Sequence, residues 1–280
     1  MKITKVLTLV VCICLTCLFF VGCGGESKIA DFTVELKTEG LMPIEDVEIR
    51  VYKDSKLSDL VWASRTNDEG KISFSAEESK KYTAVVGDLP DGYECEKTYT
   101  VSQKNTEIVL KTVLIGGDKL GDTQVSLGSV IPDFSVMAVD GKTYKISDLL
   151  KEKKAVVLNF WFLNCQPCKM EFPFLEQAYQ EYKEDIEVLA INPLDGTVSE
   201  ISKFASENSL SFPMAVGDTD FVKSFNLNSY PTTVVIDRYG TVSMIHKGSI
   251  TDKETFTKIF GYFVRDGYVQ TTVRNISDIK

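Results

Sequence analysis

Cys165 and Cys168, separated by two residues, are the side chains of this protein whose types and spacing most clearly indicate chemical reactivity. They lie in NFWFLNCQPCKMEFP, residues 159–173, between an apolar run and a Phe-Pro pair. Thiolates are both nucleophiles and metal ligands, so the pair is a redox-active dithiol, half of a zinc site or a purely structural disulfide. A zinc site needs four ligands, and Cys95 and His246, the only histidine, are poor candidates for the missing two. The spacing therefore favours redox chemistry without a metal.

The segments that flank the dithiol predict how it is positioned. Residues 153–162, KKAVVLNFWF, predict a buried strand, and residues 167–185 have apolar positions at three- and four-residue spacing, which predicts a helix. Cys165 then lies near a helix N-terminus, where unpaired N–H groups and the macrodipole stabilise a thiolate. Pro167 suits the first helical turn, because its missing N–H costs nothing there. The two-residue spacer lets Cys168 close a small ring and resolve a mixed disulfide.

The rest of this half predicts an α/β domain with a mixed sheet. A strand is expected at 186–193, a helix at 197–210, a hairpin at 229–248 and a closing helix at 252–264. A strand–helix–strand unit followed by a hairpin and a helix is typical of such folds. A C-x-x-C between a strand and a helix of this unit is a strong redox signal.

The N-terminal half predicts a small all-β sandwich over residues 31–115. Short alternating runs separated by turn signals such as NDEG and GDLPDG predict strands, at 32–38, 47–53, 71–76, 81–87, 98–102 and 106–115. The series MPIEDVEIRVY, TNDEGKISF and KKYTAVVGDLPDGYE resembles the prealbumin-like or Cna-B-type domains of bacterial surface proteins, which implies a spacer. Residues 116–128, rich in Gly and Asp, predict a linker to the second domain.

The first residues predict an export signal. Two lysines precede an apolar stretch of about 16 residues, short for a spanning helix, which needs roughly 20. The ending FVGC resembles the lipobox of bacterial lipoproteins, which implies a signal peptide over residues 1–22, lipid on Cys23 and a tether over 23–30. An uncleaved anchor and a conventional signal peptide are the alternatives. All three place the chain outside the cytoplasm, anchored at the cell membrane in the favoured case, where disulfides persist.

Composition limits the other classes of function. The chain has 280 residues, enough for two domains, and a net charge of −9, which argues against a nucleic-acid binder. Four of its seven cysteines lie in the first 23 residues, so a framework of several structural disulfides is excluded. Cys95 is expected to be a small buried hydrophobe, with a thiol partner for the second domain as the alternative.

Residues of about 124–265 resemble the thioredoxin superfamily, and within it the TlpA/ResA-like extracytoplasmic thiol–disulfide oxidoreductases. Residues 128–149, GSVIPDFSVMAVDGKTYKISDL, are similar to their N-terminal hairpin extension. Residues 156–175, VVLNFWFLNCQPCKMEFPFL, are similar to their strand, active-site motif and first helix, and residues 228–242, NSYPTTVVIDRYGTV, to their cis-proline segment. The resemblance implies an α/β thioredoxin domain at 129–268. The residues after it, 269–280, are polar, which predicts a frayed tail.

The resemblance also implies roles for individual residues. Cys165 would attack and Cys168 would resolve, with the disulfide as the only redox group and no cofactor. Glu171 matches an acid that ResA-like members place near the dithiol; the alternative is a solvated residue of the first helical turn. A substrate chain would bind along Trp161, Gln166, Pro167, Tyr230, Pro231 and Thr232. For Pro231 the alternative is an ordinary proline at the start of a strand.

Two departures from the family pattern bear on function. Asn164 stands where many members have a second tryptophan, which puts the redox potential and the partner surface in doubt. Asn159 stands where classical thioredoxins have a buried aspartate, which puts more weight on Glu171.

The function predicted from these residues is a membrane-anchored thiol–disulfide oxidoreductase. By analogy it reduces exported client proteins and is itself reduced by a membrane thiol transporter. The alternatives are a peroxiredoxin-like thiol peroxidase and a surface-binding lipoprotein whose thioredoxin domain is a scaffold. A peroxiredoxin usually has a single peroxidatic cysteine with a threonine shortly before it, which this motif lacks.

Overall fold

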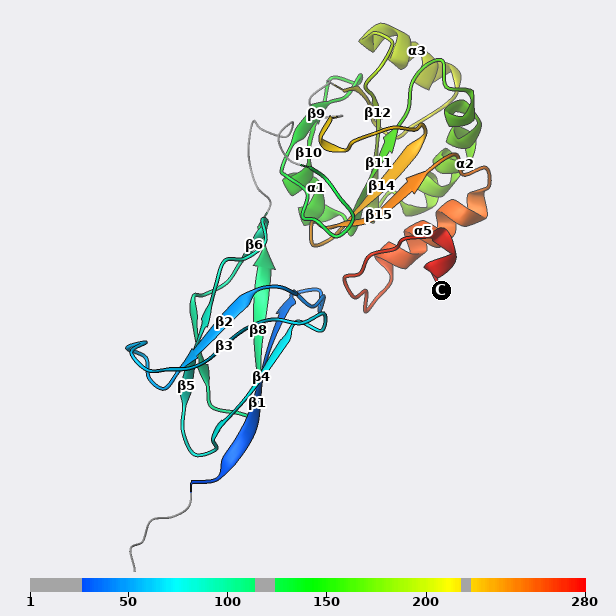
Figure 1. The fold of residues 1–280 in the computed structure, drawn as a ribbon. Coiled ribbons are helices and arrows are strands. Elements are labelled where there is room, and N and C mark those ends of the chain that lie inside the picture. The colour runs from blue at the N-terminus through cyan, green and yellow to red at the C-terminus, as the bar shows by residue number, and fades with distance from the viewer. Residues whose placement is uncertain (1–26, 114–123, 218–222) are drawn as a thin grey trace, which may run out of the picture.

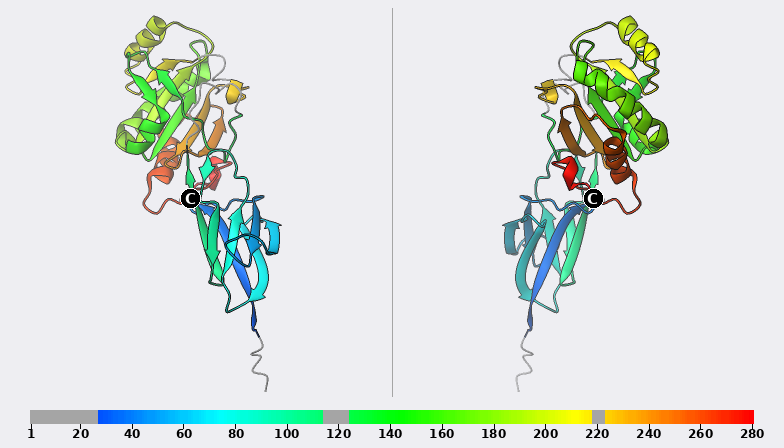
Figure 2. Two further views of the ribbon diagram at one scale, coloured as in Figure 1. Left: turned by 90° about the vertical axis from the view of Figure 1, so that its left-hand side faces the viewer. Right: turned by 90° about the vertical axis from the view of Figure 1, so that its right-hand side faces the viewer.

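A computed structural model describes residues 27–113, 124–217 and 223–280 (Figure 1). The predicted signal peptide and Cys23, with half of the tether and most of the linker, lie outside the described residues. The two halves of the chain form two domains, stacked along one long axis in the views of Figure 2. The boundaries given above between the domains remain a prediction.

The N-terminal half is all β, as predicted. Two four-stranded sheets, in the orders β4-β1-β8-β6 and β3-β2-β5-β7, enclose one apolar core. In the strands that supply the buried core residues, such as β1, β4 and β5, alternate side chains point into this core, because successive residues of a strand face opposite sides. The strands are β1 Ile29–Thr38, β2 Glu48–Tyr52, β3 Leu60–Arg65, β4 Lys71–Glu77, β5 Tyr82–Val86, β6 Tyr93–Glu94, β7 Thr98–Val101 and β8 Asn105–Thr112.

The C-terminal half is α/β with a mixed sheet, which confirms the predicted architecture. A five-stranded sheet has the order β13-β12-β11-β14-β15, with β11 parallel to β12 and antiparallel to β14. A short hairpin, β9–β10, precedes it. The elements are β9 Ser135–Met137, β10 Thr143–Lys145, α1 Ile146–Glu152, β11 Ala155–Phe160, α2 Gln166–Tyr182, β12 Ile186–Asn192, α3 Val198–Glu207, β13 Met214–Val216, β14 Thr232–Asp237, β15 Val242–Lys247, α5 Lys253–Val264 and η2 Ile276–Asp278.

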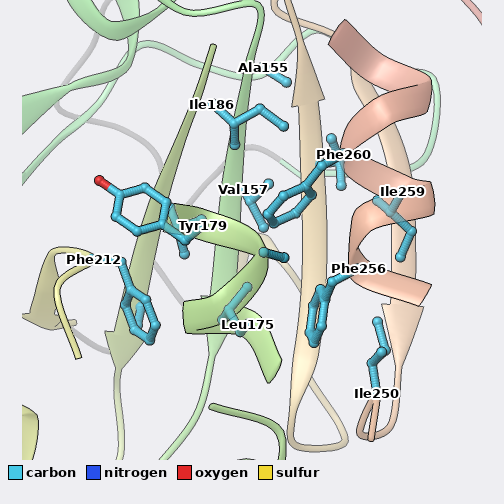
Figure 3. Close-up of a cluster of buried hydrophobic side chains, with 14 of the residues drawn as sticks. Ala155, Val157, Leu175, Tyr179, Ile186, Phe212, Ile250, Phe256, Ile259 and Phe260 are labelled. Atoms are coloured by element: carbon cyan, nitrogen blue, oxygen red, sulfur yellow. The ribbon is translucent and has the colours of Figure 1, made fainter. Parts of the chain in front are cut away.

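The sheet has apolar layers on both faces. In β11, Val157 points to the layer that α2, α3 and α5 cover, whereas Val156 and Leu158 point to the opposite layer with α1. Figure 3 shows the first layer, where Leu175 of α2 and Phe260 of α5 surround Val157. Strand β11 is therefore buried on both faces, which explains why its residues are apolar except for Asn159, and it holds the start of α2 in place.

The last residues fold back on the domain, and the expectation of a frayed tail was wrong. Val273 and Ile279 are buried in the same core as α2. Val273 also donates its backbone N–H to the carbonyl oxygen of Ser243, at 2.7 Å, and forms a parallel bridge with Met244. The widely spaced apolar residues of this segment are thus anchors along the free edge of β15.

A buried polar bridge joins the two domains. Gln270, 2% exposed, accepts the hydroxyl of Thr38 from β1 and donates to the hydroxyl of Thr241 in the β14–β15 turn. Its backbone N–H donates to the carbonyl oxygen of Gly40, at 2.8 Å. A Cβ added at Gly92 would lie 2.4 Å from the Val130 Cβ. The two domains therefore approach each other here so closely that a side chain on residue 92 would clash.

Cys95 differs from its predicted environment. It is half-buried rather than buried, and its sulfur lies 3.1 Å from the carbonyl oxygen of Glu96. The described residues give it no disulfide partner. Burial raises the pKa of its thiol, because a desolvated thiolate is disfavoured.

Candidate active site around Cys165 and Cys168

The dithiol lies where strand β11 passes into helix α2. Cys165 is the N-cap of α2, with extended backbone angles, and it is joined to Cys168 by a disulfide. The Cys165 sulfur accepts the backbone N–H of Cys168 at 3.2 Å, in the geometry by which N-cap oxygens satisfy the first turn. Pro167 lies within that first turn, as predicted. The same N–H and the helix dipole would stabilise a thiolate on Cys165 in the reduced protein.

The two sulfurs are shielded to slightly different degrees. In this oxidised form Cys165 is 3% exposed and Cys168 is fully buried. Gln166 and Pro167, between them, are exposed, as is Asn164 before them. Of the two sulfur-bearing residues, Cys165 is therefore the one with a small exposed fraction, between exposed neighbours in the loop.

Trp161 supports the dithiol from within the core. Its side chain is fully buried, stacked on Phe204 with ring centroids 5.1 Å apart and edge-on to Phe172. The sequence-based expectation that Trp161 contacts a substrate chain is contradicted by this burial. The reason is that β11 continues as buried backbone through residue 161 before the chain reaches the surface.

Glu171 is fully buried beneath the dithiol, one helical turn after Cys168. Residues three apart on a helix share a face, so its carboxylate and the Cys168 sulfur lie on the same side of α2. Its two oxygens accept the Asn159 side-chain amide at 2.7 Å and the Ile250 backbone N–H at 2.9 Å. Burial raises the pKa of Glu171 to about 7, although both hydrogen bonds act to lower it. The solvated-helix alternative is contradicted, and Glu171 can exchange a proton near neutral pH.

Asn159 on β11 completes this buried polar group. Its amide nitrogen also donates to the Thr233 hydroxyl at 3.2 Å, while its amide oxygen is buried without a hydrogen-bond partner. A protonated Glu171 is a donor and needs an acceptor. Rotation of the Asn159 amide would supply one, so the pair can satisfy both protonation states of the carboxyl.

The segment before β14 lies beside the dithiol loop. The Tyr230–Pro231 peptide bond is cis, as the resemblance implied. The Tyr230 ring is half-buried and edge-on to Phe162, with centroids 5.4 Å apart. Thr232 is buried, and its hydroxyl donates to the Ser229 carbonyl oxygen at 2.8 Å, so its side chain is already engaged within the protein. Binding of a substrate along this segment stays a prediction.

Asp195 is a residue at this site that the sequence reasoning missed. It follows β12, and its carboxylate accepts the backbone N–H groups of Leu163 at 2.6 Å and Asn164 at 3.2 Å. Because β11 and β12 are parallel, the loops that follow them lie at the same end of the sheet, beyond the carboxyl ends of both strands. An aspartate shortly after the second strand could therefore have been expected to lie beside the loop that precedes Cys165.

Comparison with known proteins places these features in a family. A family model described as the AhpC/TSA family matches residues 127–245. The thioredoxin-like protein YneN of Bacillus subtilis is 34% identical over 134 residues, which are 47% of this chain and 78% of YneN. The thiol–disulfide oxidoreductase ResA of Geobacillus kaustophilus is 36% identical over 47% of this chain and 75% of its own length.

The chain belongs to the TlpA/ResA-like thiol–disulfide oxidoreductases of the thioredoxin superfamily. A crystal structure of a thiol:disulfide interchange protein from Chlorobium tepidum is 24% identical, with a TM-score of 0.44 over 50% of this chain and 99% of its own. The ResA relative, named a thiol–disulfide oxidoreductase, confirms the predicted enzyme class, a disulfide oxidoreductase.

Two further observations apply to residues 27–113, 124–217 and 223–280. No helix there is both long and apolar enough to cross a bilayer. Nor do three or more histidine, cysteine, aspartate or glutamate side chains gather there as metal ligands.

Proposed function

We propose that this oxidoreductase is a lipid-anchored protein that reduces disulfides of exported client proteins outside the cytoplasm. The observation that carries the proposal is the placement of Cys165 as N-cap of α2, with its sulfur on the Cys168 N–H and Cys168 buried behind it. Cys165 lies at the helix N-terminus and is the sulfur that a client can reach. Cys168 lies behind it and can act as the second, internal nucleophile.

In the proposed reaction the thiolate of Cys165 attacks one sulfur of a client disulfide. A mixed disulfide forms, and the other client sulfur leaves as a thiolate that takes a proton from solvent. Cys168 then loses its proton to Glu171 and attacks the Cys165 sulfur. The Cys165–Cys168 disulfide forms, and the second client sulfur leaves and is protonated. The client gains two electrons and two protons, and a membrane thiol transporter, through its own dithiol, later returns the enzyme to the reduced form.

The reducing direction is supported by the buried carboxyl group. A negative charge at Glu171 opposes thiolate formation on the neighbouring cysteines, and a dithiol whose thiolates are not strongly stabilised is a weaker oxidant. A strong oxidant needs the opposite, a stabilised reduced form. Measurement of the redox potential against glutathione tests this: a value near −120 mV, as for a strong oxidant, would contradict a reductase.

Trapping variants test the roles of the two cysteines. Cys168→Ser should accumulate a mixed disulfide with a reporter substrate such as oxidised insulin, because attack can occur and resolution cannot. Cys165→Ser should form none. Equal trapping by both variants, seen on non-reducing gels and by mass spectrometry, would overturn the assignment.

The lipid anchor is proposed from the FVGC sequence at Cys23. In membrane fractions, the wild-type protein should carry lipid on Cys23, and Cys23→Ala should be soluble or unprocessed. A mature protein without lipid on its first residue would contradict the anchor and leave the chemistry of the dithiol untouched.

Peroxide reduction is a second candidate, because the matched family model is described as AhpC/TSA. The motif disfavours it, because both cysteines lie in one C-x-x-C, whereas a peroxiredoxin usually has a single peroxidatic cysteine with a threonine shortly before it. Consumption of hydrogen peroxide and reduction of insulin, measured on the same protein at equal concentrations, separate the two. Faster turnover of peroxide would replace the reductase proposal.

A further inference from the structure

The carboxylate of Asp195 is built into the loop that presents Cys165. Besides the two backbone N–H groups, it accepts the Asn164 side-chain amide at 2.9 Å and the Asn192 side-chain amide at 3.1 Å. Leu163 and Asn164 are the two residues that directly precede Cys165. Two of the four donors are thus backbone groups of the active-site loop itself, and a third is the side chain of the residue before the attacking cysteine.

The loop that carries Asp195 is held in place from both sides. The Asn192 side-chain oxygen accepts the backbone N–H groups of Leu194 at 3.2 Å and Asp195 at 3.1 Å. Gly196 has φ +86°, and a Cβ there would lie 2.4 Å from the Leu163 Cδ1. The two loops therefore touch at this point, and the positive φ favours glycine there, so the position of the carboxylate is set by the fold.

Asp195 is ionised at neutral pH and has no cationic partner among the described residues. Partial burial acts to raise its pKa, but the hydrogen bonds from Leu163, Asn192 and Asn164 outweigh burial, and the pKa lies below its ordinary value. In the described parts of the chain, no lysine or arginine lies within ion-pairing distance of it. Its full negative charge therefore acts on the groups around it, without an opposite charge to offset it.

Resting on the roles proposed above for the two cysteines, we propose that Asp195 is a positioning residue with two effects on the dithiol. It fixes the backbone of residues 163 and 164 by hydrogen bonds, and its charge opposes formation of the Cys165 thiolate. The second effect makes the dithiol more reducing, because a less stabilised thiolate means a less stabilised reduced form.

The size of the charge effect follows from proximity. The carboxylate contacts the residue before Cys165, and neighbouring Cα atoms are 3.8 Å apart, so the charge and the sulfur are separated by roughly 10 Å. At that distance, with an effective dielectric constant between those of a protein surface and water, the Cys165 titration midpoint moves by about 0.5 to 1 pH unit. This is about threefold to tenfold in the thiol–disulfide equilibrium, or about 15 to 30 mV.

The experiment uses the full-length protein and three variants. Asp195→Asn removes the charge and keeps the size, while Asp195→Glu keeps the charge and disturbs the hydrogen bonds. Asp140→Asn is the matched control, since Asp140 is also a loop aspartate that accepts a backbone N–H, from Lys142 at 2.9 Å, but it lies in the β9–β10 hairpin. The readouts are iodoacetamide labelling of Cys165 across pH, the equilibrium with glutathione, and thermal unfolding.

In Asp195→Asn we expect the labelling midpoint of Cys165 to fall by about 0.5 to 1 pH unit and the reduced form to be favoured about threefold to tenfold against glutathione. Asp195→Glu should keep the wild-type midpoint, and so should Asp140→Asn. A midpoint in Asp195→Asn that is unchanged or higher would overturn the charge effect, even if thermal stability falls. Failure of wild-type Cys165 to form mixed disulfides would instead contradict the underlying cysteine roles.

Discussion

Replacement of Glu171 by glutamine tests whether the buried carboxyl group titrates as its environment indicates. Glutamine has nearly the same shape, and its oxygen can accept the Ile250 N–H in place of the carboxylate. Its NH2 group then faces Asn159, whose side-chain oxygen is buried without a partner and becomes the acceptor after rotation of the amide. The substitution therefore removes the ionisable group, while the glutamine side chain can form a hydrogen bond in place of each one that Glu171 makes.

The magnitude follows from the difference between the folded and unfolded pKa values. The pKa of Glu171 rises from the ordinary 4.5 to about 7 on folding, so between these values the folded protein binds more protons than the unfolded one. Wild-type stability should therefore fall as pH rises from about 4.5 and level off above about 7. At 1.36 kcal/mol per pKa unit, the loss approaches about 3 kcal/mol.

Urea unfolding of the oxidised proteins between pH 4.5 and 8 measures this, because disulfide-bonded cysteines do not titrate. The free energy of unfolding of Glu171→Gln relative to wild type should rise by about 3 kcal/mol across the range. Glu152→Gln, an exposed change at the end of α1, is the control and should stay within about 0.5 kcal/mol of wild type. A pH-independent difference between Glu171→Gln and wild type would refute the buried, titrating carboxyl group.

Other sites give further predictions. Gly92→Val should destabilise the protein by about 2 to 4 kcal/mol in chemical unfolding, because φ is +87° and the new side chain would overlap Val130; an unchanged midpoint would mean that the domains do not touch there. Gln270→Ala should cost about 1 to 3 kcal/mol, since it leaves two buried threonine hydroxyls without their shared partner, with Gln177→Ala on the exposed face of α2 as the control. In the oxidised protein, Cys95 should label with iodoacetamide more slowly at pH 8 than free cysteine, because burial raises its pKa; labelling at the rate of free cysteine would contradict its partial burial.

The sequence predicted the parts of the fold that follow one local pattern. Strand β11 is apolar except for Asn159, and α2 has a helical period with a proline in its first turn. Both appear within a few residues of their predicted bounds. Strand β3 was missed because most of its side chains are exposed, Trp62 among them, so no alternation marks it. It forms only by pairing with β2, at an edge that local sequence does not encode.

The candidate site divides in the same way. Cys165, Cys168 and their places at the helix N-terminus follow from a motif within one short segment. The burial of Glu171 does not, because it depends on Ile250 and Asn159, which are 79 and 12 residues away. The contacts of Asp195 likewise cross from one loop to another, 31 and 32 residues along the chain.

The bridge at Gln270 determines where the active site stands relative to the N-terminal domain. Thr241 lies in the turn at one end of the β14–β15 hairpin, whereas Pro231 and the dithiol lie at its other end. The N-terminal domain therefore attaches at the end of the sheet opposite the sulfurs, with β1 running ten residues, about 33 Å, from Ile29 to the junction (Figure 1). If the lipid proposed on Cys23 holds the protein at the membrane, this stacking would set the distance between the active site and the bilayer surface. The enzyme would then select clients partly by the distance of their disulfides from the membrane, and disulfides close to the lipid surface would not reach Cys165.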